Sequence, residues 1–264
     1  GFIGSAINAV TRSGTNTFSG SVYTFFRNEK NRGDEVGKVK FIRPSENYTQ
    51  KGFRLGGPII KNKLFFFINY ETETQPKSIQ TRFASTTANP YGSADNIARP
   101  TADSLNIIRQ YLIDNYGYDP GAYDGYTPEI TRTKYLARLD WNINQKHKLN
   151  VRYSQVEGGE PNPLSSSTGG TGFTYPNGLG RTNDNSLWFQ NSNYFQGANF
   201  YSFAAELNSN FGRVSNTLRA TYTFQNDSRT TESPKTKFGT EMPLVEILSS
   251  TSVTTPAPYT TFGY

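Results

Sequence analysis

The feature that most constrains this fold is a strict alternation of apolar and polar residues in segments of about ten residues. Between residues 135 and 143 every odd position is apolar, from Tyr135 through Trp141 to Ile143, and the even positions include Arg138 and Asp140. Segments 149–154, 201–208 and 218–225 repeat the pattern. Because successive side chains of a β-strand point to opposite faces, the alternation predicts strands with one apolar face and one polar face.

Three further segments predict strands with less regular faces. Residues 19–28 are aromatic and rich in residue types that favour strands. In 52–60 the apolar positions lie opposite Arg54, and Pro58 marks the end of the strand because proline cannot donate to a ladder. In 64–74 the even positions from Leu64 to Tyr70 are apolar, which puts Phe65 and Phe67 on the polar side.

The connections between these segments alternate between short and long. The short ones are a turn at 61–63, a few residues at 145–148 and a stretch around Gly212. The long ones are 29–50, 75–132 and 158–197, followed by residues 227–264. Antiparallel strands joined in this way place every short turn at one end of the sheet and every long loop at the other.

The long connections differ in character. Residues 101–116 are predicted to form a short helix, which begins after Thr101 or Asp103 and ends at Gly117. Residues 158–180 are rich in Gly, Ser, Pro and Asn, and we expect them to be mobile unless a partner holds them. The residues after Glu232 are rich in Pro, Thr and Ser, and no regular structure is predicted for them.

The length of these loops decides between two all-β architectures. In a soluble β-sandwich, loops beyond about 12 to 15 residues are uncommon. Outer-membrane barrels instead have short periplasmic turns, long extracellular loops, an apolar lipid face and a polar interior. The sequence therefore predicts an all-β antiparallel transmembrane β-barrel, present in part as about seven strands, with long extracellular loops of which one contains the short helix. The charged residues expected to face the lumen are Arg54, Arg138, Asp140, Arg152, Glu206 and Arg219.

Composition argues against several classes of function. The chain contains no cysteine and one histidine, His147, which we expect to be a solvated turn residue. Thiolate chemistry is excluded, and neither a histidine-dependent triad nor a histidine-rich metal site is expected. Asp140, Glu206 and Glu71 are potential paired carboxylates, but charged residues on the polar face of a strand commonly do no chemistry. We therefore predict no enzymatic activity, no catalytic residue, no metal and no cofactor.

Charge and hydropathy also bear on the partners of the chain. The net charge of +6 is spread along the sequence and forms no basic block, so nucleic acid is not an expected partner. No apolar run reaches the length of a transmembrane helix, which takes about 18 residues or more. Strands such as those predicted here are therefore the only means of crossing a membrane that the sequence offers.

Aromatic residues in the long connections are the candidates for ligand binding, because an exposed Tyr or Trp offers a large contact area at low entropic cost. They are Tyr111, Tyr116, Tyr118, Tyr123, Tyr126, Phe173, Tyr175, Trp188, Phe189, Tyr194 and Phe195. The alternative is that some of them only pack the loops together. Strand aromatics such as Tyr135, Trp141 and Tyr222 fall on the apolar face, where we expect contact with lipid.

Two stretches resemble a known family. The sequence INAVTRSGTN at residues 7–16, followed by Phe18 and by FRN at 26–28, resembles the junction between plug and barrel in TonB-dependent outer-membrane transporters, particularly the Oar-like group of Bacteroidetes and myxobacteria. The sequence LGGPIIKNKLFFF at 55–67 resembles the hairpin that follows in that group. The family often has glycines where this chain has Ser5 and Ala6.

The resemblance implies a plug inside a barrel of about 22 strands, with energy supplied through TonB. Residues 1–17 would then be the C-terminal end of the plug domain, and residues 18–264 the N-terminal part of the barrel. The chain would be a fragment located in the bacterial outer membrane. Its implied partners are outer-membrane lipid, the TonB complex through a missing N-terminal region, and an unidentified extracellular ligand.

Two hypotheses of different class follow. In the first, the chain belongs to a receptor that binds a ligand at its extracellular loops and imports it when the plug rearranges. In the second, it is a secreted or surface-attached β-rich adhesin or glycan-binding module whose aromatic loops bind sugar. The two differ in whether the apolar face of the sheet meets lipid.

Overall fold

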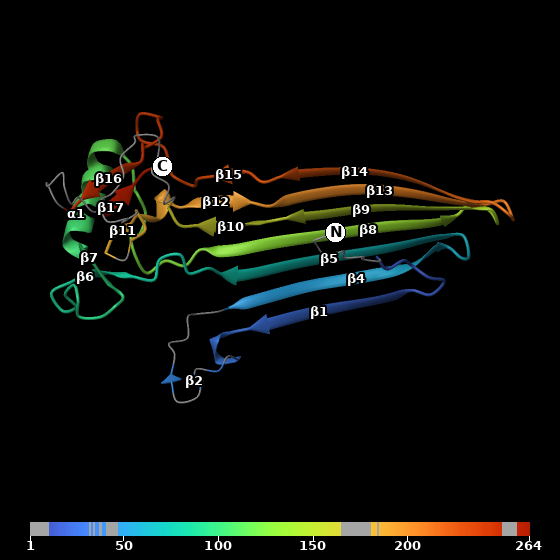
Figure 1. Ribbon diagram of the computed structural model, residues 1–264, viewed down its shortest axis with the longest axis horizontal. Coiled ribbons are helices and arrows are strands. Elements are labelled where there is room, and N and C mark those ends of the chain that lie inside the picture. Colours follow the sequence, from blue (N-terminus) through green and yellow to red (C-terminus); the bar gives the residue numbers. More distant parts are fainter. Residues whose placement is uncertain are drawn as a thin grey trace, which may run out of the picture.

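The computed structural model describes residues 11–31, 33, 35–36, 39–40, 47–164, 181–183, 185–249 and 258–264. One long antiparallel sheet dominates the molecule, and smaller elements gather at one of its ends (Figure 1). No helix within the described ranges has both the length and the apolar character needed to cross a membrane.

The large sheet has seven strands, arranged in the order in which they follow one another along the chain. They are β1 (Ser19–Arg27), β4 (Tyr48–Ile60), β5 (Leu64–Pro76), β8 (Glu129–Asn142), β9 (His147–Glu157), β13 (Asn199–Asn210) and β14 (Ser215–Asn226). Every neighbouring pair is antiparallel. The predicted strands are confirmed, and most run longer than the alternation indicated. Among the described strands the sheet is open, because β1 and β14 each pair on one side only.

Three tight turns lie together at one end of the sheet, as predicted (Figure 1). We call this the hairpin end, and the opposite end the loop end. The turn between β4 and β5 contains Asn62 with a φ of 62°, and the turn between β13 and β14 contains Gly212 with a φ of 86°. Asn and Gly tolerate this left-handed region better than other residues. Regular pairing of β4 with β5 shifts after Pro58, which agrees with its predicted place near the strand end.

The long connections fold together at the loop end (Figure 1). They form β6 (Phe83–Ser85), β7 (Ile97–Thr101), α1 (Ala102–Tyr116), β11 (Leu187–Trp188), η3 (Gln190–Ser192), β16 (Val245–Leu248) and β17 (Pro258–Phe262). We call this group the loop cap. Its sheets are the pair β6-β7 and the three strands β11-β17-β16.

Two smaller groups complete the described elements. The strands β10 (Gly159–Asn162), β12 (Tyr194–Gly197) and β15 (Arg229–Thr230) form a three-stranded sheet between the large sheet and the loop cap (Figure 1). The first long connection holds η1 (Glu29–Asn31) and the short pair of β2 (Glu35–Val36) with β3 (Val39–Lys40).

The prediction that the residues after Glu232 lack regular structure is wrong. β16 and β17 lie in this stretch and pair with each other, and β17 also pairs with β11 in parallel. The strands are short, and β17 pairs with Leu187 and Trp188 of β11, which are far away in sequence. Local alternation carries no information about such contacts. Of residues 158–180, which were predicted to be mobile, Gly159–Asn162 form β10 and pair with β12, and residues 165–180 lie outside the described residues.

The predicted helix is confirmed as α1, and its ends have the expected chemistry. The Thr101 hydroxyl accepts a hydrogen bond from the Ser104 N–H, which satisfies one of the free donors of the first turn. Gly117 has a φ of 61°, and its N–H donates to the Ile113 carbonyl at 2.9 Å. A glycine in this conformation terminates helices without steric cost.

The hydrophobic core lies in the loop cap, because most of the buried apolar residues of the described chain belong to one cluster there. The cluster consists of Ala84, Ala98, Leu105, Leu112, Tyr118, Leu187, Phe189, Met242 and Phe262. These residues come from three connections that are separate in sequence. Within the described part of the chain, no second layer covers the apolar face of the large sheet (Figure 1).

Candidate functional site

The large sheet separates apolar from charged side chains. Leu139, Trp141, Phe203 and Phe224 share one face and are between 41% and 50% exposed. Leu207, on the same face, is partly exposed. A soluble β-sandwich would bury such residues between two sheets. Their exposure therefore favours a face that meets an apolar solvent.

A row of aromatic residues crosses this apolar face. Tyr70 lies opposite Phe53 on one side and Tyr135 on the other, and Tyr201 lies opposite Phe224. The ring centroid of Tyr70 lies 5.9 Å from that of Phe53 and 5.1 Å from that of Tyr135. Those of Tyr201 and Phe224 are 6.1 Å apart. Outer-membrane barrels carry such rows where the hydrocarbon region ends.

The apolar face has a limit at each end. Toward the loop end, the next alternate row beyond the aromatic residues contains Lys51, Thr72 and Thr133. Toward the hairpin end, Trp141 follows Tyr135 by six residues on β8, which corresponds to about 20 Å along a strand. The apolar bands of outer-membrane barrels are about 25 Å tall. The face thus has a height close to that of a membrane interior.

The opposite face carries all the charged residues that were predicted to face a lumen. The register places Arg54, Arg138, Asp140, Arg152, Glu206 and Arg219 on this one face. Both carboxylates are paired, Asp140 with Arg138 at 2.7 Å and Glu206 with Arg219 at 2.5 Å. We call this the charged face.

A larger ion-pair cluster lies on the charged face nearer the loop end. The Lys134 ammonium lies 2.8 Å from Glu71 and 3.3 Å from Glu73, and Arg132 lies 2.7 Å from Glu73. The Tyr23 hydroxyl also donates to Glu71 at 3.0 Å. Of these residues, only Glu71 was a candidate from the sequence. Residues 71 and 73 are acidic, and residues 132 and 134 are basic at the same spacing. Only the register of β5 with β8 places the acidic pair opposite the basic pair.

The residues that precede β1 run along the charged face. We call residues 11–18 the leading segment. One Arg138 nitrogen donates to both the carbonyl and the hydroxyl of Thr11, each at 2.8 Å. The guanidinium is held in place by Asp140, which accepts from Nε and from Nη2. Arg138 therefore fastens the leading segment to the sheet.

The leading segment then turns into β1 at the hairpin end. A Cβ atom on Gly14 would lie 2.2 Å from the Phe66 carbonyl oxygen, so only glycine permits this approach of two backbones. Beyond it, Asn16 and Asn62 exchange two hydrogen bonds of 2.6 and 2.7 Å. The chain thus passes from the charged face, around the β4-β5 turn, into the first strand.

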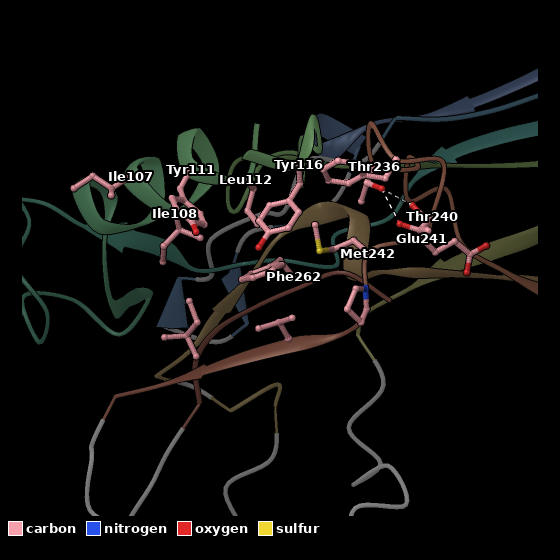
Figure 2. A pocket seen from close by; sticks show the side chains of 14 residues that line it. Ile107, Ile108, Tyr111, Leu112, Tyr116, Thr236, Thr240, Glu241, Met242 and Phe262 are labelled. Atoms are coloured by element: carbon pink, nitrogen blue, oxygen red, sulfur yellow. Dashed lines mark hydrogen bonds between the residues drawn. The ribbon is translucent and has the colours of Figure 1, made fainter. Parts of the chain in front are cut away.

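A groove of about 640 Å³ opens in the loop cap between α1 and the stretch that contains β16. Figure 2 shows Ile107, Ile108 and Tyr111 on the helix side, with Met242 and Phe262 facing the helix. The rings of Tyr111 and Tyr116 meet edge-on with centroids 6.3 Å apart. Both tyrosines were predicted ligand-binding candidates, and both line the groove.

Three of the other predicted loop aromatics are buried in the loop cap or at its edge. Tyr118 and Phe189 have no exposed surface, and Trp188 is 6% exposed. The Tyr118 hydroxyl is hydrogen-bonded to Ser233, and the Trp188 indole N–H donates to Asn193. Because these side chains are enclosed, we assign them to packing of the loops.

The remaining loop aromatics are partly buried or lie outside the described residues. Tyr123 packs edge-on against Phe189, and Tyr194 lies beneath the Arg229 guanidinium at 3.7 Å. Burial raises the pKa of Tyr126 to about 12, and its hydroxyl accepts from Asn193. Phe195 lies in β12, and Phe173 and Tyr175 fall outside the described ranges.

The expectation for His147 is only partly right. The residue follows a tight turn, but it begins β9 and is partly buried. Its Nδ1 is hydrogen-bonded to the Ser209 hydroxyl at 2.8 Å, and its ring meets Phe211 edge-on. Pairing of β9 with β13 brings these residues together. In the part of the chain that the structure describes, no group of three or more acidic or histidine side chains is placed to hold a metal ion.

Comparison with known proteins gives the chain a family. Residues 10–263 match the family described as outer membrane beta barrel domain. The chain belongs to this family. It is also similar to the TonB-dependent transporter Oar of Myxococcus xanthus, with 30% identity over 175 residues. This similarity covers 64% of the chain and 15% of the transporter, so the chain spans only a small part of that relative. No solved structure matches the chain.

Membership of the outer-membrane β-barrel family confirms the resemblance found in the motifs and places the protein in the outer membrane. The family is transporter-like and typically non-enzymatic. The seven-stranded antiparallel sheet, with one exposed apolar face, agrees with part of such a domain, but within the described residues the sheet is open and forms no closed barrel.

Proposed function

We propose that this chain is part of an energy-coupled receptor that captures an extracellular ligand with its loop cap and imports it when a plug rearranges. The observation that carries the proposal is the leading segment, which runs along the charged face and is fastened there by Arg138. A chain that leaves a plug inside a barrel must take such a path to reach the first barrel strand.

In this proposal the two faces of the sheet lie in different environments. The apolar face meets outer-membrane lipid, and the charged face lines the lumen. An Arg on the lipid face near the bilayer midplane is destabilising by about 2 to 4 kcal/mol. A slip of one residue would turn Arg138, Arg152 and Arg219 toward lipid, so the cost of burying charge fixes the register.

The proposal also assigns domains and partners. Residues 1–17 form the end of the plug, and residues 18–264 form the first part of the barrel. Further strands beyond β1 and β14 close the barrel in the full-length protein. The similarity to a TonB-dependent transporter supports TonB as the energy-coupling partner, through a region outside this chain.

Cysteine accessibility tests the plug and its coupling. The chain contains no cysteine, so Thr11→Cys introduces a single reporter into it, and cysteines elsewhere in the full-length protein are removed. Intact cells that express the protein are treated with a membrane-impermeant maleimide. We expect labelling of Thr11→Cys to rise when TonB is present and energised, because plug movement frees the leading segment. Labelling that is the same in a strain without TonB would contradict the proposal.

The matched control is Ser93→Cys, which lies on the exposed surface of the loop cap. It should be labelled equally with and without TonB, because its exposure needs no plug movement. A second measurement separates the proposal from a soluble adhesin or glycan-binding module. The full-length protein should require detergent to stay monodisperse, and monodispersity in plain buffer would favour the adhesin.

A further inference from the structure

The three tight turns at the hairpin end gather positive charge. Because the turns are far apart in sequence, their cations come together only when the sheet forms (Figure 1). All of these side chains are exposed. They are Lys61 and Lys63 at the β4-β5 turn, Lys146 and Lys148 at the β8-β9 turn, and Arg213 at the β13-β14 turn. We call these five residues the basic edge.

No carboxylate in the described part of the chain neutralises the basic edge. Within the described ranges, none of its five side chains forms an ion pair or a hydrogen bond. The first carboxylates along the strands from this end are Asp140 and Glu206, and they already pair with Arg138 and Arg219. The basic edge therefore presents its charge to whatever lies beside the turns.

The backbone of these turns is fixed, although the cationic groups are free. The Asn144 Oδ1 atom accepts hydrogen bonds from the N–H groups of Lys146 and His147, at 2.8 and 3.0 Å. The Asn210 Oδ1 atom accepts from the Gly212 N–H at 2.9 Å. Turns this short hold the cations close to the ends of the strands, so a partner must lie at that level.

Exposed apolar side chains adjoin the same cations. Ile60 precedes Lys61, and Phe211 and Val214 lie on either side of Arg213. The three apolar side chains are each more than half exposed. This combination is typical of a membrane interface, where the cation reaches the headgroups and its apolar neighbour stays in hydrocarbon. A polyanion dissolved in water would leave these apolar side chains exposed.

The basic edge also lies at the height of a headgroup layer. Trp141 lies near the limit of the apolar face on β8, and the next residue, Asn142, donates its N–H to the Lys63 carbonyl at 2.7 Å. The turns extend between one and three residues beyond Trp141, which is about 3 to 10 Å. The headgroup layer on each side of a bilayer is about 5 to 8 Å thick. The cations are thus level with lipid phosphates.

From these observations we propose that the basic edge binds the phosphate headgroups of anionic phospholipids in the membrane leaflet at the hairpin end. Neighbouring turns are two strands apart, about 10 Å, so the three turns meet different headgroups. Lysine and arginine near a membrane surface are attracted by its anionic lipids. The inference goes beyond the proposed function, and it needs only that the apolar face of the sheet meets lipid.

Selective quenching of Trp141 tests the inference. The full-length protein that retains Trp141 alone is placed in vesicles of phosphatidylcholine that contain one fifth phosphatidylglycerol. In one preparation the phosphatidylglycerol has brominated acyl chains, and in the other an equal amount of the phosphatidylcholine has them. Trp141 reports on lipid beside two of the turns, because β8 pairs with both β5 and β9. We expect brominated phosphatidylglycerol to quench at least about twofold more strongly.

Two variants of equal charge locate the effect. Lys61→Gln combined with Lys146→Gln removes one cation from each turn beside Trp141, and it should at least halve the excess quenching by phosphatidylglycerol. Lys30→Gln combined with Lys235→Gln removes the same charge from the long connections and should leave the excess unchanged. All four lysines are exposed, so both variants should fold, and circular dichroism checks this.

Three results would overturn the inference. Equal quenching by the two brominated lipids would show that the basic edge does not select anionic lipid, and would favour an acidic protein as its partner. An excess that persists when Lys61 and Lys146 are neutralised would place the selection elsewhere. Quenching of Trp141 by neither lipid would also contradict the assignment of the apolar face to lipid.

The outcome is separable from that of the transport proposal. The measurement uses purified protein, without TonB and without a transported ligand. Both leaflets of the vesicle contain phosphatidylglycerol, so the result does not depend on the orientation of insertion. Selection of phosphatidylglycerol without TonB-dependent labelling of Thr11→Cys would contradict only the transport proposal, and the reverse combination would contradict only the role of the basic edge.

Discussion

At the scale of single residues, the ion pair between Arg109 and Asp119 fastens α1 to the turn that follows it. Arg109 donates to the two Asp119 oxygens at 2.8 and 2.7 Å, and the Gly121 N–H donates to the same carboxylate. The hydrogen bonds from Arg109 lower the pKa of Asp119, against an opposing effect of burial. The pair therefore stabilises the loop cap above the ordinary pKa of an aspartate, and this contribution is lost as pH falls through the lowered value.

Asp119→Asn should remove this acid-dependent part of the stability. Both side chains are more than one third exposed, so we expect a loss of no more than about 1 kcal/mol at neutral pH. Hydrogen exchange of the α1 amides, followed from neutral to acidic pH, measures the effect. Asp114→Asn, on the same helix and without an ion pair among the described contacts, is the control. Identical acid profiles for Asp119→Asn and the unmodified protein would contradict this account.

At the scale of the strand, the two faces of β8 should respond differently to the same substitution. Leu139 and Leu136 lie on opposite faces, the first on the apolar face and the second on the charged face. In lipid vesicles, Leu139→Arg should destabilise the full-length protein by about 2 to 4 kcal/mol, because the guanidinium would face hydrocarbon. Leu136→Arg should cost much less. Urea unfolding measures both variants, and equal losses would contradict the assignment of the faces.

The same scale explains which elements the sequence predicts. The strands of the large sheet are long and pair mostly with neighbours in sequence, so the alternation around Leu139 or Phe203 is sufficient to find them. β11 and β17 have two and five residues and pair in parallel across a long separation, and no local pattern marks such a contact. The ion pair of Glu73 with Arg132 was missed for a similar reason, since it depends on register.

The candidate site was predicted only by residue type. Both Tyr111 and Tyr118 were predicted as ligand-binding candidates, because both are tyrosines in one long connection. The structure exposes Tyr111 at the groove and buries Tyr118 completely. The difference arises from residues of other connections, such as Met242 and Phe262, which pack beside α1. The sequence of the connection that contains α1 gives no information about these packing partners.

At the scale of the whole molecule, the two tryptophans report on the two environments. Trp141 lies on the apolar face and is 41% exposed, whereas Trp188 is 6% exposed near the loop cap core. In vesicles with brominated acyl chains, bromine quenches fluorophores that touch the hydrocarbon. With other tryptophans of the full-length protein replaced, the variant that retains Trp141 should be strongly quenched. The variant that retains Trp188 should keep most of its emission, and strong quenching of both would contradict the proposed orientation.

The shared core of the loop cap also limits how its binding surface can change. Ala98, Leu187 and Phe262 come from three different connections and belong to one buried cluster. If one connection were replaced by that of a relative, the buried residues of the other two would lose their packing partners, even if the new connection supplied suitable ligand contacts. If the protein is the receptor proposed above, a new ligand specificity should thus require a matched set of three connections, and chimaeras designed for a new ligand should transplant them together.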